Sequence, residues 1–367
     1  MFNQVTILNL YRTIKCTIKL YKNSFIFDRE KEKLRKPMLK RLSLVQYLDG
    51  ILGGNRFVLS RAITLTESEL EADKDMASEL LNALLPYTGK SIRIGITGVP
   101  GVGKSTFIEA FGAFITGLGK KLAVLAIDPT SQRTSGSIMG DKTRMEALGR
   151  DPLAFIRPSP AGNSLGGVSR KTREALLLCE AAGYEVVLVE TVGVGQSETA
   201  VSSMVDFFLL LMLAGAGDEL QGIKKGIMEL ADAVVITKAD EGNEHKARLA
   251  QAEYQSALHL FPPAENSWYP QVLTCSALKK IGIQDVWELI EKFQEQQTHN
   301  GWLVKKRKNQ NKAWLHEIIK SELENQFYNH LQIKKLLLEK EQKVQDNELH
   351  VVNVAHELLN LFFSKNK

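Results

Sequence analysis

Cysteine is scarce in this chain of 367 residues, and its placement excludes several classes of protein. The three cysteines, Cys16, Cys179 and Cys275, are isolated and odd in number. This usage excludes a disulfide framework and favours a reducing compartment, so we expect a cytoplasmic protein, with the mitochondrial matrix as the alternative. There is also no Cys-x-x-Cys pair and no histidine tract. A dedicated zinc or nickel store therefore has no visible ligands.

Long apolar runs are missing as well. The longest covers ten residues, 207–216, and directly follows Asp206. Ten residues are too few to cross a membrane but suit a strand that is buried on both faces. We therefore expect no membrane partner.

Outside the first 41 residues the chain has no strong excess of positive or negative charge. Residues 1–41 hold eleven Lys and Arg against three acidic residues, a net of +8, so that with +5 for the whole chain residues 42–367 carry −3. The basic character belongs to the leader, and it gives no reason to expect a nucleic-acid partner.

One stretch carries a specific chemical pattern. Residues 98–105 read G-V-P-G-V-G-K-S and satisfy the phosphate-binding pattern G-x-x-x-x-G-K-[ST]. Strand-like alternation precedes the stretch and helical spacing follows it, so the loop is predicted at a strand-to-helix turn where backbone amides face phosphate oxygens. We expect a nucleoside triphosphate, with Lys104 on its β- and γ-phosphates and Ser105 on Mg²⁺. The residues predicted to bind it here are Gly98, Val99, Pro100, Gly101, Val102, Gly103, Lys104, Ser105 and Thr106.

Apolar strand-like segments alternate with helical segments from residue 91 to residue 297. Strands are predicted at 91–97, 122–127, 154–157, 186–189, 207–213, 233–237 and 271–275, and helices from 105 and at 171–182, 222–230, 244–259 and 283–297. This order predicts an α/β fold with a doubly wound, mainly parallel sheet, and the loop makes it a P-loop NTPase. Ligands of such sheets bind beyond the carboxyl ends of the strands.

Helical segments are expected on both sides of this region. Residues 41–85 predict two or three amphipathic helices, and a charge run at 305–312 predicts a basic linker before further helices. We expect a leader that is disordered or precedes the true start at Met38. The four predicted parts are the leader at 1–37, a helical segment at 38–88, the nucleotide domain at 89–297 and a helical arm at 298–367.

Acidic side chains follow the strands that neighbour the loop. Asp128 comes directly after the strand at 122–127, Glu190 closes the strand at 186–189, and Asp141 lies between them. A phosphate-bound Mg²⁺ takes one or two protein carboxylates, so these three and Ser105 are the predicted metal ligands. Glu190 is the expected Walker-B-type group, and Asp141 is expected to report the γ-phosphate. The alternative is that each is a solvated acid at a strand end.

The next two strands end in residues that suit guanine. The Asp240 carboxylate can accept both the N1 and N2 hydrogens of guanine, a pattern that adenine lacks, and the Lys238 stem can lie over the base. Backbone amides at Ser276 and Ala277, with Leu278 beside them, are predicted to contact guanine O6. The order of these groups after the loop at 98–105 argues for GTP.

At this point the chain resembles the MeaB/ArgK-type G proteins, which are chaperones of adenosylcobalamin-dependent methylmalonyl-CoA mutase and were formerly labelled LAO/AO transport ATPases. The match runs from about residue 59 to residue 291. The matching words are GVPGVGKST at 98–106, IDP at 127–129, GDKTRM at 140–145, IRPSP at 156–160, LGG at 165–167, KTRE at 171–174, ETVGVGQSE at 190–198 and GDELQGIKKG at 217–226.

The resemblance implies a GTPase of the SIMIBI class that works as a homodimer and gates cofactor loading or protects the mutase. It implies that residues 193–196 form switch II and that residues 218–225 form a third mobile segment read by the partner. Our candidates for catalytic residues are Lys104, Glu190 and Gln196. Gln196 is a candidate for ordering the attacking water, and a purely structural role is the alternative. The helices after residue 302 are expected to supply a two-fold dimer arm or simply to cover the domain.

One position departs from the family pattern. Thr237 stands where the guanine word usually has Asn, so a hydrogen bond that braces the base pocket is expected to be lost, at a cost of roughly 0.5–1.5 kcal/mol. Two other functions stay open: a P-loop kinase or ATPase acting on a small metabolite, and a metal-delivery GTPase, although the missing His tract and paired Cys disfavour the latter. The mutase served is also open, because methylmalonyl- and isobutyryl-CoA enzymes could use similar chaperones.

Overall fold

The computed structural model describes residues 41–127, 145–158, 165–191, 197–215, 225–262 and 265–364. The chain divides into two units, Met1–Gln46 and Tyr47–Lys367. In the first unit, Ser43 and Gln46 cap helix α2 (Leu44–Leu52) reciprocally, because each backbone amide donates to the other side chain. Among the described residues, no helix has the length and apolar character needed to cross a membrane.

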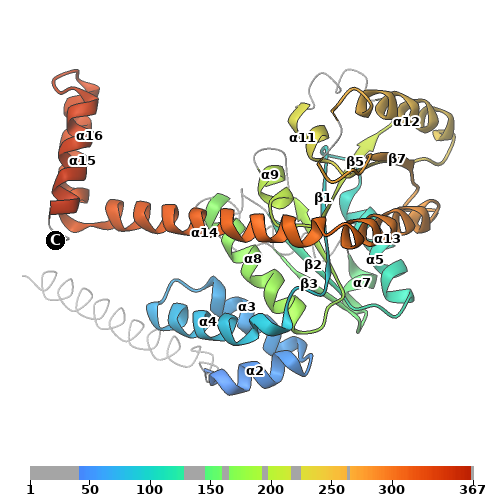
Figure 1. The fold of residues 1–367 in the computed structure, drawn as a ribbon, viewed down its shortest axis with the longest axis horizontal. Helices are drawn as coiled ribbons and strands as arrows, with labels where there is room; N and C mark the ends of the chain where they lie inside the picture. Colours follow the sequence, from blue (N-terminus) through green and yellow to red (C-terminus); the bar gives the residue numbers. More distant parts are fainter. Residues whose placement is uncertain are drawn as a thin grey trace, which may run out of the picture. The chain divides into compact units, whose positions relative to one another are not determined.

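The second unit is built around a seven-stranded parallel sheet (Figure 1). The strands are β1 (Ile92–Gly98), β2 (Leu122–Ile127), β3 (Ala154–Arg157), β4 (Val186–Thr191), β5 (Phe207–Leu213), β6 (Ala233–Thr237) and β7 (Gln271–Thr274). Their order is β3-β2-β4-β1-β5-β6-β7, and neighbouring strands pair in parallel throughout. The predicted fold class is confirmed, and all seven predicted strands are present.

Both faces of the sheet are covered by helices, and β5 illustrates how. Its alternate residues Phe207, Leu209 and Leu211 pack with α5 (Lys104–Gly117) and α13 (Ile283–His299). The intervening Leu210 and Met212 pack with α11 (Lys225–Leu230) and α12 (Glu244–Leu258). Because successive side chains of a strand point to opposite faces, a run that is apolar at every position fits a strand covered twice.

The remaining described elements complete the N-terminal, central and C-terminal parts of the chain. They are α3 (Arg56–Glu67), α4 (Glu71–Leu84), η1 (Leu85–Tyr87), α7 (Glu146–Arg150), α8 (Leu165–Ala181), α9 (Ser197–Ser202), α14 (Trp302–Asn329), α15 (Leu331–Gln345) and α16 (Val351–Ser364). Arg157 at the end of β3 donates to Glu67 and forms an ion pair with it, which joins α3 to the sheet. The last two helices bury a small core of their own around Ile333, Val354, Leu358 and Phe362.

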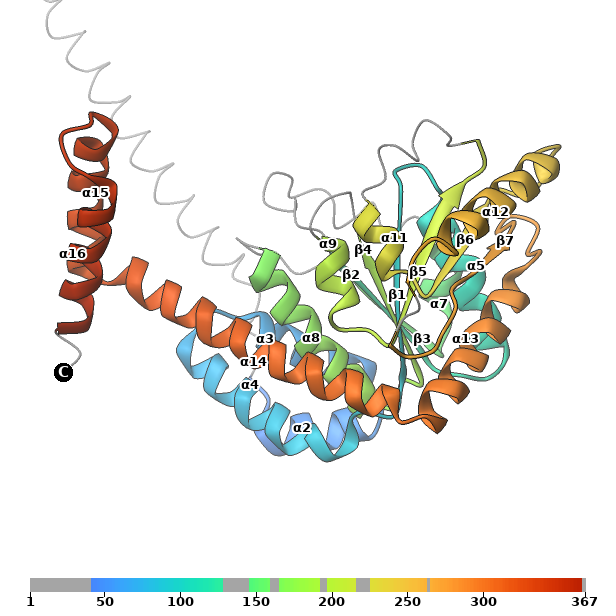
Figure 2. The same cartoon turned by 45° about the horizontal axis from the view of Figure 1, so that its top comes forward.

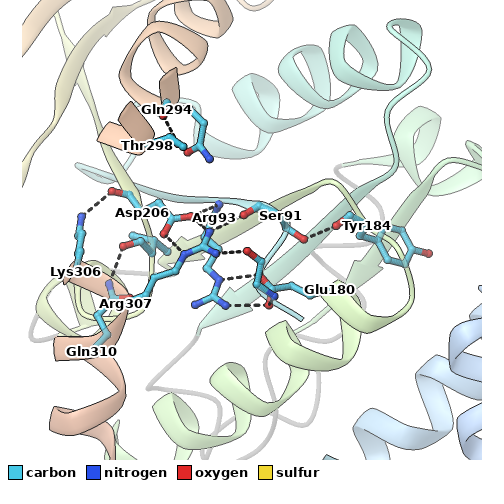
Figure 3. A network of polar contacts seen from close by, with 12 residues as sticks. Ser91, Arg93, Glu180, Tyr184, Asp206, Gln294, Thr298, Lys306, Arg307 and Gln310 are labelled. Carbon is cyan, nitrogen blue, oxygen red and sulfur yellow. Dashed lines mark hydrogen bonds and ion pairs between the residues drawn. The ribbon is translucent and has the colours of Figure 1, made fainter. Parts of the chain in front are cut away.

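The predicted basic linker at 305–312 is wrong, because these residues lie inside the uninterrupted helix α14. The Arg307 guanidinium donates to both carboxylate oxygens of Asp206, at 2.8 and 2.6 Å, and to the carbonyls of Gly89 and Ser91 (Figure 3). Asp206 is fully buried, and its second oxygen also accepts from the Arg93 amide at 3.0 Å. Arg307 is therefore paired at the amino ends of the strands rather than solvated, and it anchors α14 there.

Candidate nucleotide-binding site

The loop between β1 and α5 uses glycine where a side chain would collide or where the backbone is left-handed. A Cβ at Gly98 would meet the carbonyl oxygen of Leu211 on β5. Gly101 and Gly103 have φ of 78° and 90°, a region that favours glycine. Gly103 is also the N-cap of α5, so the first amides of that helix follow the loop directly. The backbone has the form expected of a phosphate cradle.

Lys104 opens α5 and turns its side chain back onto the loop. Its Nζ donates to the carbonyl of Gly98 at 2.8 Å and to that of Val99 at 3.5 Å. Burial lowers the pKa of this ammonium, while the carboxylates of Glu190 and Glu198 act in the opposite direction. A partly buried cation that rests on neutral carbonyls suits an anionic ligand, because such a ligand would stabilise its charge.

Glu190 lies on β4, beside the strand that leads into the loop. The Cα atoms of Ile96 and Glu190 are register partners, and the Glu190 side chain is buried. One residue further on, the hydroxyls of Thr97 and Thr191 share a hydrogen bond of 2.8 Å between two buried side chains. The structure therefore brings Glu190 to the same edge as Lys104, as the sequence predicts.

Glu198 is a member of this site that sequence reasoning missed. It lies in the first turn of α9, is only 2% exposed, and lies close enough to Lys104 to influence the pKa of its ammonium. The available signal was its position in the same family word as Glu190. A single acid in a six-residue helix has no periodicity that would distinguish it from a solvated group.

The side of the site predicted to bind guanine is built by the turns after β6 and β7. Asp240 accepts a hydrogen bond from the Ser276 hydroxyl, and the Ser276 oxygen in turn accepts from the Lys279 amide at 3.1 Å. Lys238 has a φ of 56°, its side chain is exposed, and its carbonyl accepts from Asn243 Nδ2 at 2.9 Å. These contacts fix the turn that carries Asp240 against the turn that carries Ser276.

The Lys238 stem also reaches the phosphate loop, because its Cε lies 4.0 Å from where a Cβ on Gly103 would be. By contrast, the Ser276 amide is already used: it donates to the Ile281 carbonyl at 3.0 Å. Of the two amides expected at guanine O6, the Ser276 amide thus has another partner, and the Ala277 amide stays the candidate. Leu278 is 71% exposed beside it.

Thr237 connects the two halves of the site. Its buried hydroxyl lies 2.7 Å from the Val102 carbonyl of the loop and 3.2 Å from the Met212 carbonyl of β5. A hydroxyl has one hydrogen to donate, so these two acceptors share it. Although Thr replaces the usual Asn at this position, the Thr237 side chain still bonds β6 directly to the phosphate loop.

Several predicted residues lie outside the described part of the chain. They are Asp128, Asp141, Gln196 with the rest of the predicted switch II at 193–196, and residues 218–224 of the predicted third segment. Ser105 and Glu190 are the predicted metal ligands within it, and both offer the oxygen donors that Mg²⁺ prefers. In the described ranges no three His, Cys, Asp or Glu side chains gather into a metal cluster.

Fold and loop together define a P-loop NTPase. A family model described as methylmalonyl Co-A mutase-associated GTPase MeaB matches residues 59–332. The chain is 48% identical over 294 residues to the GTPase ArgK of Escherichia coli, covering 80% of this chain and 88% of that protein. It is 45% identical over 326 residues to the mitochondrial methylmalonic aciduria type A homolog of Mus musculus, covering 86% and 79%.

Structural comparison agrees with these matches. A crystal structure described as an LAO/AO transport system kinase aligns with a TM-score of 0.70 and 39% identity, covering 88% of this chain and 99% of that one. The chain belongs to the MeaB family of GTPases.

Proposed function

We propose that this protein is a Mg²⁺-dependent GTPase that acts as a chaperone of an adenosylcobalamin-dependent acyl-CoA mutase, in the first place methylmalonyl-CoA mutase. The observation that carries the GTPase part is the convergence of Lys104, Glu190 and Asp240 at one edge of the sheet, with Thr237 bonded to the phosphate loop. The mutase part is supported by the description of the family model and by the name of the mouse relative.

The phosphates of GTP would lie in the loop at 98–106. Lys104 would exchange its bonds to the Gly98 and Val99 carbonyls for bonds to phosphate oxygens, and its positive charge would stabilise the negative charge of the transferring group. Ser105 and Glu190 would hold Mg²⁺, directly or through water, together with the predicted ligands Asp128 and Asp141. When bound, the metal neutralises phosphate charge. Gln196 stays the candidate for ordering the attacking water.

Guanine selection would rest on Asp240. Its carboxylate is held by the Ser276 hydroxyl, so the free lone pairs can face the N1 and N2 hydrogens of the base without reorganisation. The Ala277 amide would bind O6, and the Lys238 stem, which lies against Gly103, would cover the base plane.

We further propose that the protein works as a homodimer through its C-terminal helices. On α14, Leu315, Ile319 and Leu323 recur every four residues and are 55%, 47% and 53% exposed. Apolar side chains at this spacing form one stripe along a helix, and a stripe of this kind suits a second copy of the chain. The isolated cysteines keep the cytoplasm as the proposed compartment, with the mitochondrial matrix as the alternative because the mouse relative is named mitochondrial.

A second candidate function is a P-loop kinase acting on a small metabolite, because the aligned solved structure is described as a kinase. The two functions differ in the acceptor of the phosphoryl group. For a GTPase, inorganic phosphate should appear in equal amount to GDP with water as the only acceptor. A kinase would instead transfer phosphate to an added amino acid or other metabolite.

Hydrolysis by the purified full chain tests the proposal. We expect GTP turnover that stops on removal of Mg²⁺ with EDTA and falls about 10²–10³-fold in Lys104→Ala, the range for loss of one transition-state donor. Lys120→Ala is the control, since Lys120 is 4.0 Å from Glu185 outside the site. Unchanged turnover in Lys104→Ala would contradict the proposal. Co-purification of a mutase in the GTP-bound but not the GDP-bound state tests the partner.

A further inference from the structure

Arg173 on α8 lies at a junction that the nucleotide site does not use. It is only 5% exposed, yet its guanidinium reaches two different elements. Nη2 donates to the Ser203 hydroxyl at 2.6 Å, just after α9, and Nη1 donates to the Gln310 carbonyl on α14 at 3.4 Å. Its guanidinium also lies 5.7 Å from the Trp314 ring centre and 3.6 Å from the Glu317 carboxylate. α8 and α14 run side by side here (Figure 2).

The connection between α9 and β5, residues 203–206, is held by α14 at further points. Gln310 Nε2 donates to the Val205 carbonyl at 2.8 Å, and Lys306 Nζ donates to the Asp206 carbonyl at 2.6 Å. Arg307 binds the Asp206 carboxylate (Figure 3). A displacement of α9 therefore acts on a segment that is bonded to the C-terminal helix.

α9 is also packed tightly against the strand that leads into the phosphate loop. At Gly95 on β1, a Cβ would lie 2.7 Å from Val201 Cγ1 and 3.0 Å from Val205 Cγ2. Val201 and Val205 are fully buried. Well-packed contacts of this kind transmit small shifts rather than absorbing them. Burial lowers the pKa of the Lys104 ammonium and Glu198, in the first turn of α9, acts to raise it, so α9 links the surroundings of Lys104 to the Arg173 junction.

Polar atoms at the junction indicate that its bonding is incomplete. Among the described residues, Arg173 Nε, Trp314 Nε1 and Gln310 Oε1 are buried without a hydrogen-bond partner. Two donors and one acceptor lie on contacting residues, and buried polar atoms of this kind are costly to leave unpaired. Because the three atoms are two donors and one acceptor, they have the chemistry for a hydrogen bond that the present arrangement does not make.

We propose that Arg173 is a positioning residue that couples the nucleotide state of the site, through α9 and Ser203, to the position of α14. The proposal rests on the proposed GTPase function. It assigns the C-terminal helix a second role besides joining two copies: its position on α8 differs between the GDP-bound and GTP-bound states. By linkage, the same contacts alter the relative affinity for the two nucleotides.

The test is ¹⁹F NMR of the full chain labelled with 5-fluorotryptophan, with GDP and with a non-hydrolysable GTP analogue. The chain has four tryptophans, and Trp314→Phe assigns the reporter. We expect the Trp314 signal to shift between the two nucleotides, and Arg173→Lys to abolish the shift while changing the ratio of analogue to GDP affinity at least about 5-fold. Ser203→Ala, a milder change, should reduce the shift. The control is Arg170→Lys, on the same helix but paired with Glu174.

The outcomes separate this inference from the proposed function. If labelled GDP and the GTP analogue bind but the Trp314 signal is identical in both states, the coupling is refuted and the GTPase stands. The same holds if Arg173→Lys and Ser203→Ala both keep the wild-type shift and affinity ratio. If the wild-type chain binds no guanine nucleotide, the proposed function fails and this inference fails with it. Urea unfolding of each variant shows whether a lost shift reflects a lost fold.

Discussion

Thr237 illustrates how one side chain acts on two parts of the site. Its hydroxyl is within hydrogen-bonding distance of the Val102 carbonyl in the phosphate loop and the Met212 carbonyl in β5. Buried carbonyls lose a compensating bond when such a donor is removed, and the cost of one unsatisfied group is about 1–3 kcal/mol. The loop would lose its link to the strand that leads to Asp240.

We therefore expect Thr237→Val to lower the free energy of unfolding by about 1–3 kcal/mol and to weaken GDP binding. Thr237→Asn restores a donor and should recover most of both losses. Urea unfolding and titration with a fluorescent GDP measure the two effects. Thr116→Val is the matched control, because Thr116 Oγ1 donates within α5 to the Ala113 carbonyl. Equal GDP affinity in Thr237→Val and Thr116→Val would refute the brace.

Glu174 on α8 gives a pH dependence whose sign can be worked out. Burial raises the pKa of this carboxyl, and the hydrogen bond from Arg170 at 3.0 Å only partly opposes the rise. The folded chain therefore holds this proton to higher pH than the unfolded chain does. The contribution of Glu174 to stability is fully present below its unfolded pKa and is lost as the pH rises through the folded pKa. Each tenfold difference in proton affinity between the two states corresponds to about 1.4 kcal/mol.

Glu174→Gln removes this titration. The difference between the two free energies of unfolding, variant minus wild type, should therefore increase from pH 4 to pH 7. Urea unfolding at several pH values measures it. Glu185→Gln serves as the control because the Glu185 side chain is 53% exposed. A difference that is flat with pH, or that decreases, would contradict the assigned burial.

At the scale of elements, α14 shows why a charge run can be misinterpreted. Residues 305–312 contain five basic residues, a composition typical of solvated linkers, and nothing in their spacing reveals that Arg307 meets a fully buried Asp206 about a hundred residues away. Breaking such a pair by removing one partner leaves a buried charge without compensation, at a cost of about 3–5 kcal/mol.

Arg307→Met should accordingly destabilise the chain by about 3 kcal/mol in urea unfolding. Lys305→Met, two residues earlier on the same helix, is the control, because Lys305 and its partner Glu265 are 59% and 79% exposed. Exposed pairs contribute about 0–1 kcal/mol. If the two substitutions cost the same, Arg307 is not the anchor of α14.

The sequence predicted the elements whose pattern is long and regular. The strands are apolar or alternating segments, and the fold class follows from their alternation with helices. The short helices α7 and α9, of five and six residues, were not predicted, and helices shorter than two turns carry little periodicity. α11 has only six residues too, but it lies within the predicted helix at 222–230. α8 begins at Leu165 rather than at the predicted residue 171.

Within the site, residue types were predictable but their bonds were not. The phosphate loop and Asp240 belong to short sequence patterns that can be identified from residue order alone. The hydrogen bond from the Ser276 amide to the Ile281 carbonyl depends on the turn after β7. The hydrogen bond from the Thr237 hydroxyl to the Val102 carbonyl depends on how β6 lies beside the loop. Contacts between segments more than a hundred residues apart are not encoded in local spacing.

At the scale of the whole molecule, the apolar stripe on α14 predicts the assembly. We expect a dimer in light scattering coupled to gel filtration, and a monomer for Ile319→Glu, since a carboxylate would be buried in the interface without a partner. Lys320→Glu, at the adjacent position with a 79% exposed side chain, should stay dimeric. A dimer in Ile319→Glu would place the interface elsewhere.

Guanine recognition is the central claim about the whole molecule, and one measurement tests it most directly: the affinities of wild type and Asp240→Asn for GTP, ATP and XTP. Xanthine carries an oxygen where guanine has its N2 amine, so an Asn at 240 can donate to it while the wild-type carboxylate is repelled. We expect wild type to prefer GTP over both other nucleotides and Asp240→Asn to prefer XTP. Equal or tighter binding of ATP by wild type, or an unchanged preference in Asp240→Asn, would contradict this account.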